Sequence, residues 1–145
     1  MFLGAGADAR NARVVAEHLV LANLSGVDTH GILHVPLYVT SIREKLTLPK
    51  AWPQILEESL TSVHVSGNWT FGQVAAKYTM ETVIAKAKAQ GIAIGGLVQT
   101  NHIGRLGHYV EMAADEGLIA MVWGGGYGVE TPVAAPFGGK ERVLH

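Results

Sequence analysis

Apolar residues recur at helical spacing in several stretches of the chain. Val14, Val15, His18 and Leu19 follow this spacing between residues 7 and 24, and they predict a helix that Asp8 caps at its start. The same spacing predicts helices over residues 73–90 and 105–116. A further helix is expected from a cap at position 28 or 29 to about residue 44, with a proline in its first turns. The pattern therefore predicts a helix-rich chain.

Shorter apolar runs predict the strands. Gln54 to Glu58 and Ser62 to Val65 have the length of short strands, and a turn from Gly67 to Gly72 follows them. Ile92 to Val98 and Leu118 to Trp123 are continuous apolar runs, which are typical of strands buried on both faces. The second half of the chain thus alternates helix and strand. This order favours an α/β arrangement with at least two central strands, in which ligands gather at the carboxyl ends of the strands.

Composition narrows the class of protein. The chain has 145 residues, 48% of them hydrophobic and 16% charged, which suits one domain with a real core. The net charge is −1 and the basic residues are scattered, which argues against nucleic-acid binding. Cysteine is absent, so disulfides and thiolate chemistry are excluded. No apolar run approaches the ~20 residues of a membrane span and no signal-peptide layout is present, so we expect a cytoplasmic protein.

The first segment with candidate chemistry contains two histidines. Asp28, Thr29, His30 and Gly31 follow one another directly, and His34 and Tyr38 come after them at intervals of four residues. An imidazole at the start of a helix is partly exposed and titrates near neutral pH, so His30 is a candidate for proton transfer. The alternative is a capping segment in which the histidine makes only local hydrogen bonds. His30 and His34 have the spacing of a metal pair on one helix face, but the complete HExxH pattern is absent.

The second candidate segment joins the predicted strand at Ile92–Val98 to the following helix. Asn101 is a suitable helix cap, and His102 lies where an α/β protein places catalytic groups. Arg105 lies a few residues further on and has the geometry to hold a carboxylate with two hydrogen bonds. The alternative is a glycine-rich turn with an arginine that faces solvent.

Two glycine-rich segments resemble nucleotide-binding loops only weakly. Trp123 to Glu130 is glycine-rich after a predicted strand, but prolines follow where a helix is needed, so we interpret it as a loop that lines a pocket. Gly4 to Ala9 has the spacing of a dinucleotide fingerprint, but only three residues precede it, too few for the required strand. Neither segment therefore identifies a cofactor site.

The two histidine segments, taken in this order, resemble the type-2 malate/L-lactate dehydrogenases. This family also includes ureidoglycolate, sulfolactate and diketogulonate oxidoreductases. Four stretches carry the resemblance in the family's order: ANLSGVDTHGILHVPLYVTSIREKL, SGNWTFGQVAAKYTMETVIAKAK, GLVQTNHIGRLGHYVEMAADEGLIAMVW and PVAAPFGGKERVLH. The matches run from about residue 11 to residue 145, nearly the whole chain.

The resemblance implies a fold, a reaction and roles for particular residues. Members have mixed helices and central strands in an α/β fold that is not a Rossmann fold, form homodimers, and interconvert 2-hydroxy and 2-oxo acids with NAD or NADP. His30 and His102 match the two family histidines, and Tyr38 matches a tyrosine on the substrate side. We expect His102 to be the acid/base and His30 to orient the substrate. Asn101 and Arg105 are further candidates for substrate contacts.

This chain departs from the family pattern in three respects. Many members carry an arginine that binds the substrate carboxylate at the position of His34, so we expect His34 to contact a substrate other than malate or lactate. The loop from Gly124 to Thr131 looks longer than in the family. Members are also more than twice as long as this chain.

The length of the chain leaves two further interpretations open. We expect residues 1–50 to form a helical segment and residues 51–145 an α/β segment, with the cofactor-binding part missing, so that the chain alone has little or no activity. It is then either the N-terminal portion of a dehydrogenase or an inactive remnant that serves as a structural or interaction domain. A third alternative is a small metal-binding protein that uses His30, His34, His102 and His108.

Overall fold

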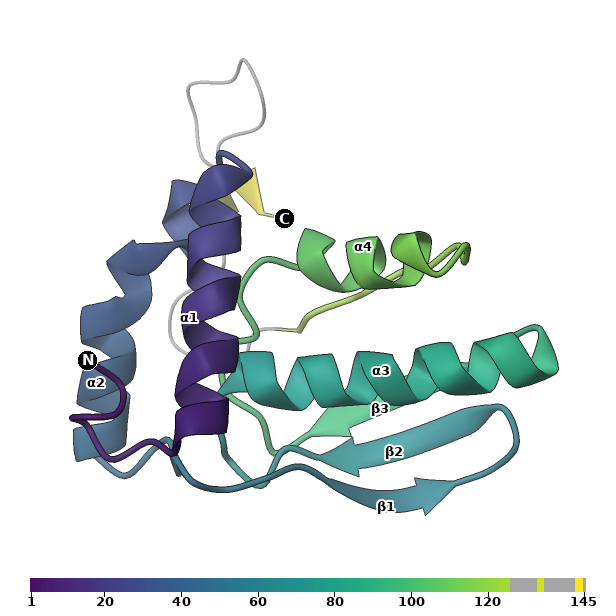
Figure 1. Ribbon diagram of the computed structural model, residues 1–145, viewed down its shortest axis with the longest axis horizontal. Helices are drawn as coiled ribbons and strands as arrows, with labels where there is room; N and C mark the ends of the chain where they lie inside the picture. The colour runs from purple at the N-terminus through teal and green to yellow at the C-terminus, as the bar shows by residue number, and fades with distance from the viewer. Residues whose placement is uncertain (126–132, 135–142, 145) are drawn as a thin grey trace.

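Helices dominate the part of the chain that the computed structural model describes, which comprises residues 1–125, 133–134 and 143–144 (Figure 1). The helices are α1 (Ala9–Leu24), α2 (Val35–Arg43), α3 (Gly72–Gln90) and α4 (Gly107–Asp115), with two 3-10 turns at Asp28–His30 and Ile32–His34. The strands are β1 (Gln54–Glu58), β2 (Ser62–Ser66), β3 (Ile94–Val98), β4 (Val133–Ala134) and β5 (Val143–Leu144). The predicted α/β class is therefore confirmed.

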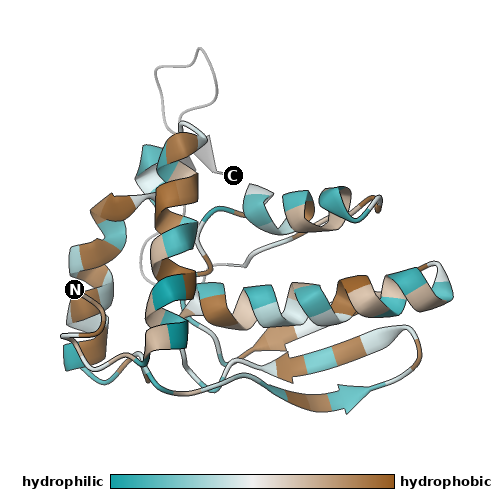
Figure 2. Ribbon diagram, in the orientation of Figure 1, coloured by the Kyte–Doolittle hydropathy of each residue, from teal (hydrophilic) through white to brown (hydrophobic). Residues whose placement is uncertain are grey.

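A sheet, α3 and α4 form successive layers in one half of the molecule, and α1 and α2 lie beside them (Figure 1). In the sheet, β2 lies between β1 and β3, antiparallel to β1 and parallel to β3. Val63 and Val65 of β2 are buried, and α3 packs against both β2 and β3. The alternation of apolar and polar residues along β2 can be followed in Figure 2. The two-residue strands β4 and β5 pair with each other.

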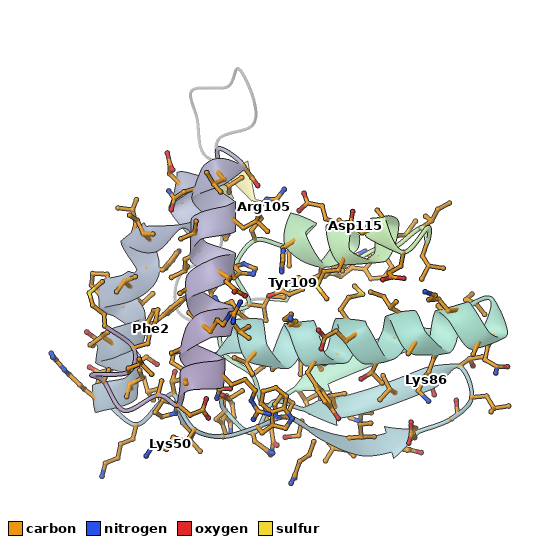
Figure 3. All side chains as sticks on the ribbon, viewed as in Figure 1. Phe2, Lys50, Lys86, Arg105, Tyr109 and Asp115 are labelled. Atoms are coloured by element: carbon orange, nitrogen blue, oxygen red, sulfur yellow. The ribbon has the colours of Figure 1, made fainter. Side chains whose placement is uncertain are left out.

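The hydrophobic core has two parts. The first joins the N-terminal residues to α1, α2 and the start of α3, and its buried members include Phe2, Val15, Leu19, Tyr38 and Val74. The second lies between α3 and α4, where Tyr109 is in contact with the side of α3 that carries Ala76 and Met80 (Figure 3). Asp8 accepts a hydrogen bond from the Asn11 N–H at 2.8 Å, so the predicted cap of α1 is confirmed. None of the helices in the described ranges is long and apolar enough to span a bilayer.

Two strand predictions are wrong in part. The strand expected over Ile92–Val98 begins at Ile94, and most of its side chains are exposed, because β3 pairs only with β2 among the described residues. The segment Leu118–Trp123 forms no strand there. Its side chains still alternate, since Leu118, Ala120 and Val122 pack on the second core cluster while the residues between them point outward. The apolar run reflects one packed face rather than burial on both.

Candidate active site

Three histidines from two distant segments meet near the start of α3. His30 and His34 lie in the two 3-10 turns, and His102 lies in the loop between β3 and α4. The ring centroid of His102 lies 5.5 Å from that of His30 and 4.9 Å from that of His34. The structure therefore brings together the two histidines that the sequence suggested for proton transfer.

Tyr38 connects the two segments by a direct hydrogen bond. Its side chain projects from α2, is buried, and stacks on the ring of His34 with an interplanar angle of 13°. The Tyr38 hydroxyl lies 2.8 Å from Nδ1 of His102. On its other side, Nε2 of the buried Gln73 donates to the same hydroxyl at 2.7 Å. Tyr38 is thus held between the imidazole and an amide.

The segment that carries His30 and His34 is less regular than predicted. A single helix was expected from position 28 or 29, but α2 begins only at Val35, and no side chain caps it. A proline such as Pro36 is tolerated in the first turn of a helix, because the N–H groups there have no carbonyl partner within the helix. The chain before Pro36 forms two short 3-10 turns instead of regular helix. Nε2 of His34 donates to the Thr29 carbonyl at 2.7 Å, which fixes this ring against the first turn.

The loop that carries His102 is fixed against the residues before α3. The Asn101 amide donates to the carbonyls of Trp69 at 3.1 Å and of Thr70 at 2.8 Å. Asn101 was expected to cap the following helix, and this is wrong, because α4 begins only at Gly107. A Cβ on Gly72 would lie 2.2 Å from the His102 carbonyl oxygen, so only glycine allows this close approach. Asn101 and Gly72 together fix the backbone of His102.

A second contact fixes the far end of the same loop. The backbone N–H of Arg105 donates to Nε2 of the buried His18 at 2.9 Å. The preceding Gly104 has φ +77°, and a Cβ there would lie 2.3 Å from Nε2 of His18. Glycine at position 104 therefore allows both the left-handed backbone and the approach of the histidine. In this way α1 helps to determine the course of the His102 loop.

Arg105 does hold a carboxylate with two hydrogen bonds, but the carboxylate belongs to this chain. Its guanidinium donates to both carboxylate oxygens of Glu111, to Oε2 at 2.8 Å and to Oε1 at 2.5 Å. Figure 3 places Arg105 beside the start of α4. The hydrogen bonds between the two side chains raise the pKa of Arg105 and lower that of Glu111. A substrate carboxylate would have to displace Glu111, and the suggested role of Arg105 stays a prediction.

His102 is partly exposed, but the desolvation of its ring beside Tyr38, His34 and His30 lowers its pKa from 6.5 to about 4, and positive charge on His34 and His30 acts in the same direction. His102 is therefore neutral at physiological pH. Burial also raises the pKa of Tyr38 to about 12, against the effect of the hydrogen bond from Gln73. The site therefore presents a neutral imidazole hydrogen-bonded to a neutral phenol. Such a pair exchanges hydrogen bonds with a polar ligand without bringing a net charge into the site.

The structure does not gather the four histidines of the metal-binding alternative. His108 packs on the ring of His18 at 4.9 Å between centroids rather than on the cluster of His30, His34 and His102. Over the described ranges, no group of three or more histidines and carboxylates is arranged to hold a metal ion.

The glycine segment before α1 does not have the geometry of a dinucleotide fingerprint. Residues 2–6 form a turn, so Gly4 and Gly6 do not directly follow a strand as the fingerprint requires. The glycine-rich loop from Gly124 to Thr131 lies largely outside the described residues. A groove of about 490 Å³ runs between α1 and α3, and its lining combines four apolar residues of α1 with the polar or charged side chains of Glu17, His18, Gln73, Lys77 and His108.

The roles of His18 and Gln73 in the site were not predicted from the sequence. Both residues have the spacing of the apolar face of their helix, since His18 falls among Val15, Leu19 and Ala22, and Gln73 lies three residues before Ala76. A polar residue in register with a buried face must find a hydrogen-bond partner there. That mismatch is the signal that would have identified both.

Comparison with known proteins decides the family. The family model described as malate/L-lactate dehydrogenase matches residues 1–144. The chain belongs to this family. It is 36% identical over 141 residues to hydroxycarboxylate dehydrogenase B of Escherichia coli (strain K12), a match that covers 97% of this chain and 38% of the relative. It is 34% identical over 139 residues to L-sulfolactate dehydrogenase of Methanocaldococcus jannaschii, covering 96% and 39%.

Solved structures of the malate/L-lactate dehydrogenase family share the fold. Malate dehydrogenase from Entamoeba histolytica superposes with a TM-score of 0.78 and 37% identity, over 80% of this chain and 32% of that one. A putative malate/lactate dehydrogenase from E. coli gives a TM-score of 0.78 at 32% identity, over 99% of this chain and 40% of that one. The fold is thus that of the malate and lactate dehydrogenases, and the chain spans less than two fifths of the length of these curated relatives.

Proposed function

We propose that this chain is the proton-handling portion of an oxidoreductase that interconverts a 2-hydroxy acid and a 2-oxo acid with NAD or NADP. The observation that carries the proposal is the meeting of His30, His34 and Tyr38 with His102, including the hydrogen bond from Tyr38 to His102. Relatives of this family are named hydroxycarboxylate, malate, lactate and sulfolactate dehydrogenases.

In this proposal each residue of the cluster has a separate role. His102 is the acid/base at the substrate oxygen, because it is neutral and held by Tyr38. His30 orients the substrate from the opposite segment. His34 contacts the substrate with an imidazole that is shorter than arginine, which favours a substrate other than malate or lactate. Tyr38 lines the substrate side of the site.

The nicotinamide carries the hydride in such a reaction. In this proposal, residues outside those described hold most of the cofactor. We propose that the complete enzyme acts in the cytoplasm as a homodimer, as the family resemblance implies. Its partners are then a small 2-hydroxy or 2-oxo acid and the cofactor.

The test is an assay of the protein at the family's full length with this segment in place. Oxidation of NADH and NADPH is followed with a panel of 2-oxo acids. We expect turnover with at least one of them, and a fall of roughly 10²- to 10⁴-fold in kcat for His102→Gln. His64→Gln is the matched control, because His64 is an exposed histidine on β2. Absence of turnover with every acid and both cofactors would refute the proposal.

A further inference from the structure

A buried amide lies behind the tyrosine of the site. Gln73, the second residue of α3, is 1% exposed. Its Nε2 donates to the Tyr38 hydroxyl at 2.7 Å, whereas its Oε1 has no hydrogen-bond partner among the described residues. A buried acceptor without a partner is unusual in proteins, so the orientation of this amide has a cost that something must offset.

One direction of the hydrogen bonds between these three residues gives the Tyr38 hydrogen an acceptor, since no acceptor other than His102 lies beside the Tyr38 hydroxyl among the described residues. A phenol oxygen accepts hydrogen bonds and donates a single hydrogen. Because Gln73 donates to this oxygen, the Tyr38 hydrogen is available for Nδ1 of His102, 2.8 Å away. Nδ1 then acts as the acceptor and carries no hydrogen. A neutral imidazole with a bare Nδ1 carries its hydrogen on Nε2.

We propose that Gln73 is a positioning residue that sets the tautomer of His102 through Tyr38, so that His102 presents an N–H donor at Nε2. The inference rests on the proposed function for its meaning in catalysis, but the tautomer itself is measurable without turnover.

With the hydrogen on Nδ1 of His102, Tyr38 would accept from both neighbours and its own hydrogen would have no acceptor among the described residues. The amide of Gln73 could supply that acceptor only by turning around, so that its Oε1 accepts from Tyr38. This arrangement would move the NH₂ group to the place where Oε1 now lies, which offers no partner among the described residues. An unpartnered NH₂ leaves two donors unsatisfied, whereas the present orientation leaves one carbonyl oxygen. The structure therefore favours the Nε2–H tautomer.

The tautomer determines which form of the substrate the resting site accepts. An N–H donor at Nε2 complements the carbonyl oxygen of a 2-oxo acid, which only accepts hydrogen bonds. A bare Nε2 would complement the hydroxyl of a 2-hydroxy acid, which has a hydrogen to donate. Gln73 thus prepares the neutral site for the 2-oxo acid. The lowered pKa of His102 supports this, because an imidazolium would carry both hydrogens and have no tautomer to select.

The experiment reads the ring nitrogens of His102 directly in the 145-residue chain. Long-range ¹H–¹⁵N spectra at pH 7.5 distinguish a nitrogen that carries hydrogen from one that does not, and His102→Gln assigns the signals. We expect Nε2 protonated and Nδ1 bare in the wild type. In Gln73→Glu the carboxylate accepts the Tyr38 hydrogen, so the hydrogen of His102 moves to Nδ1. Gln54→Glu, at an exposed position on β1, leaves the spectrum unchanged.

Two further variants test the tautomer of His102 if Gln73→Glu does not fold. Gln73→Met removes both polar groups at similar length, and we expect a mixture of the two tautomers. Tyr38→Phe breaks the connection, so adding Gln73→Met to it has no further effect on His102. A wild-type spectrum with hydrogen on Nδ1, or a folded Gln73 variant with an unaltered tautomer, would overturn the proposal.

Catalysis gives a separate readout in the protein of full family length. There Gln73→Met lowers kcat by about 10- to 100-fold, the usual effect of removing a residue that orients a functional histidine, while KM changes little. If the spectra change as expected but no 2-oxo acid is turned over, the proposed function fails and the tautomer assignment stands. If turnover occurs and the spectra do not change, the proposed function stands and the tautomer assignment fails.

Discussion

The folded chain favours the neutral form of two histidines, the buried His18 and the partly exposed His102. For each of them, desolvation by neighbouring residues is the main reason that the pKa falls from 6.5 to about 4. The neighbouring charges act in the same direction, since His108 and Arg105 lie close to His18, and His34 and His30 lie close to His102. Both residues belong to hydrogen bonds that fix the His102 loop, so their protonation is linked to the stability of the site.

The pH dependence of stability follows from these two pKa values. The unfolded chain takes up a proton at each histidine near pH 6.5, whereas the folded chain does so only near pH 4. Stability is therefore complete above pH 6.5 and is lost as the pH falls from 6.5 toward 4. In His18→Gln, the amide oxygen can still accept from the Arg105 N–H but does not titrate. We expect this variant to lose less stability than the wild type over this range in urea unfolding.

The carboxylates of Glu111 and Glu116 also have lowered pKa values, so acid weakens the fold through them as well. Only the difference between His18→Gln and the wild type isolates the histidine. The exposed His64 provides the control, because His64→Gln should leave the pH profile parallel to that of the wild type. Parallel profiles for His18→Gln would contradict the neutral, buried state of His18.

At the scale of elements, the site depends on how closely the start of α3 approaches the His102 loop. Gly72 makes this approach possible, since a Cβ there would lie 2.2 Å from the His102 carbonyl oxygen and 2.3 Å from that of Asn101. Gly72→Ala should therefore push the loop away and lower the free energy of unfolding by about 1–3 kcal/mol, as overpacking does in other cores. Urea unfolding measures the loss, and the ring signals of His102 report the displacement.

Gly4→Ala is the matched control for this prediction. Its Cβ would meet only the Met1 carbonyl at 3.4 Å, which is an ordinary contact. We expect this variant to unfold within about 0.5 kcal/mol of the wild type, as most surface substitutions do. Equal stability of the two variants would mean that the loop adapts without cost.

Helices were easier to predict from this sequence than strands. The helices α1 and α3 have sixteen and nineteen residues, so their apolar positions recur over several turns and would rarely fit helical spacing by chance. Both helices are confirmed. The strand predicted at Leu118–Trp123 depended on a short apolar run, which cannot reveal whether a neighbour offers it hydrogen bonds. The helix α2 begins later than predicted, at Val35. Pro36 indicated that a helix could start nearby, but not that the residues before it would form separate turns.

The candidate site was predictable in part for a similar reason. His30, His34, Tyr38 and His102 follow recognisable local patterns, and the family resemblance connects them. The contacts from Gln73 to Tyr38 and from His18 to Arg105 join residues far apart in the chain. Their side chains fit the helical spacing of apolar neighbours, so periodicity alone counted His18 as part of a core face. The local pattern shows that each of the two residues needs a partner, but not which distant residue supplies it.

At the scale of the whole molecule, the residues after α4 present an apolar strip to solvent. Ile119, Met121 and Trp123 are 98%, 72% and 80% exposed, and they alternate with residues that pack inward. Among the described residues no backbone hydrogen bond is made by the N–H groups of 119–123. A strip with unpaired backbone and large apolar side chains resembles an uncovered sheet edge, which tends to pair with another chain.

We therefore expect the isolated chain to self-associate through this strip. Sedimentation velocity over a range of concentrations should show association in the wild type, and Ile119→Ser with Met121→Ser should weaken it by burying less apolar surface in the complex. The control pair is Leu24→Ser with Leu60→Ser, whose side chains are 80% and 75% exposed but lie elsewhere. Because both pairs remove similar apolar area, only a strip-specific contact separates them. Equal behaviour of the two pairs, or a wild-type chain that stays monomeric at every concentration, would exclude the strip as an interface between copies.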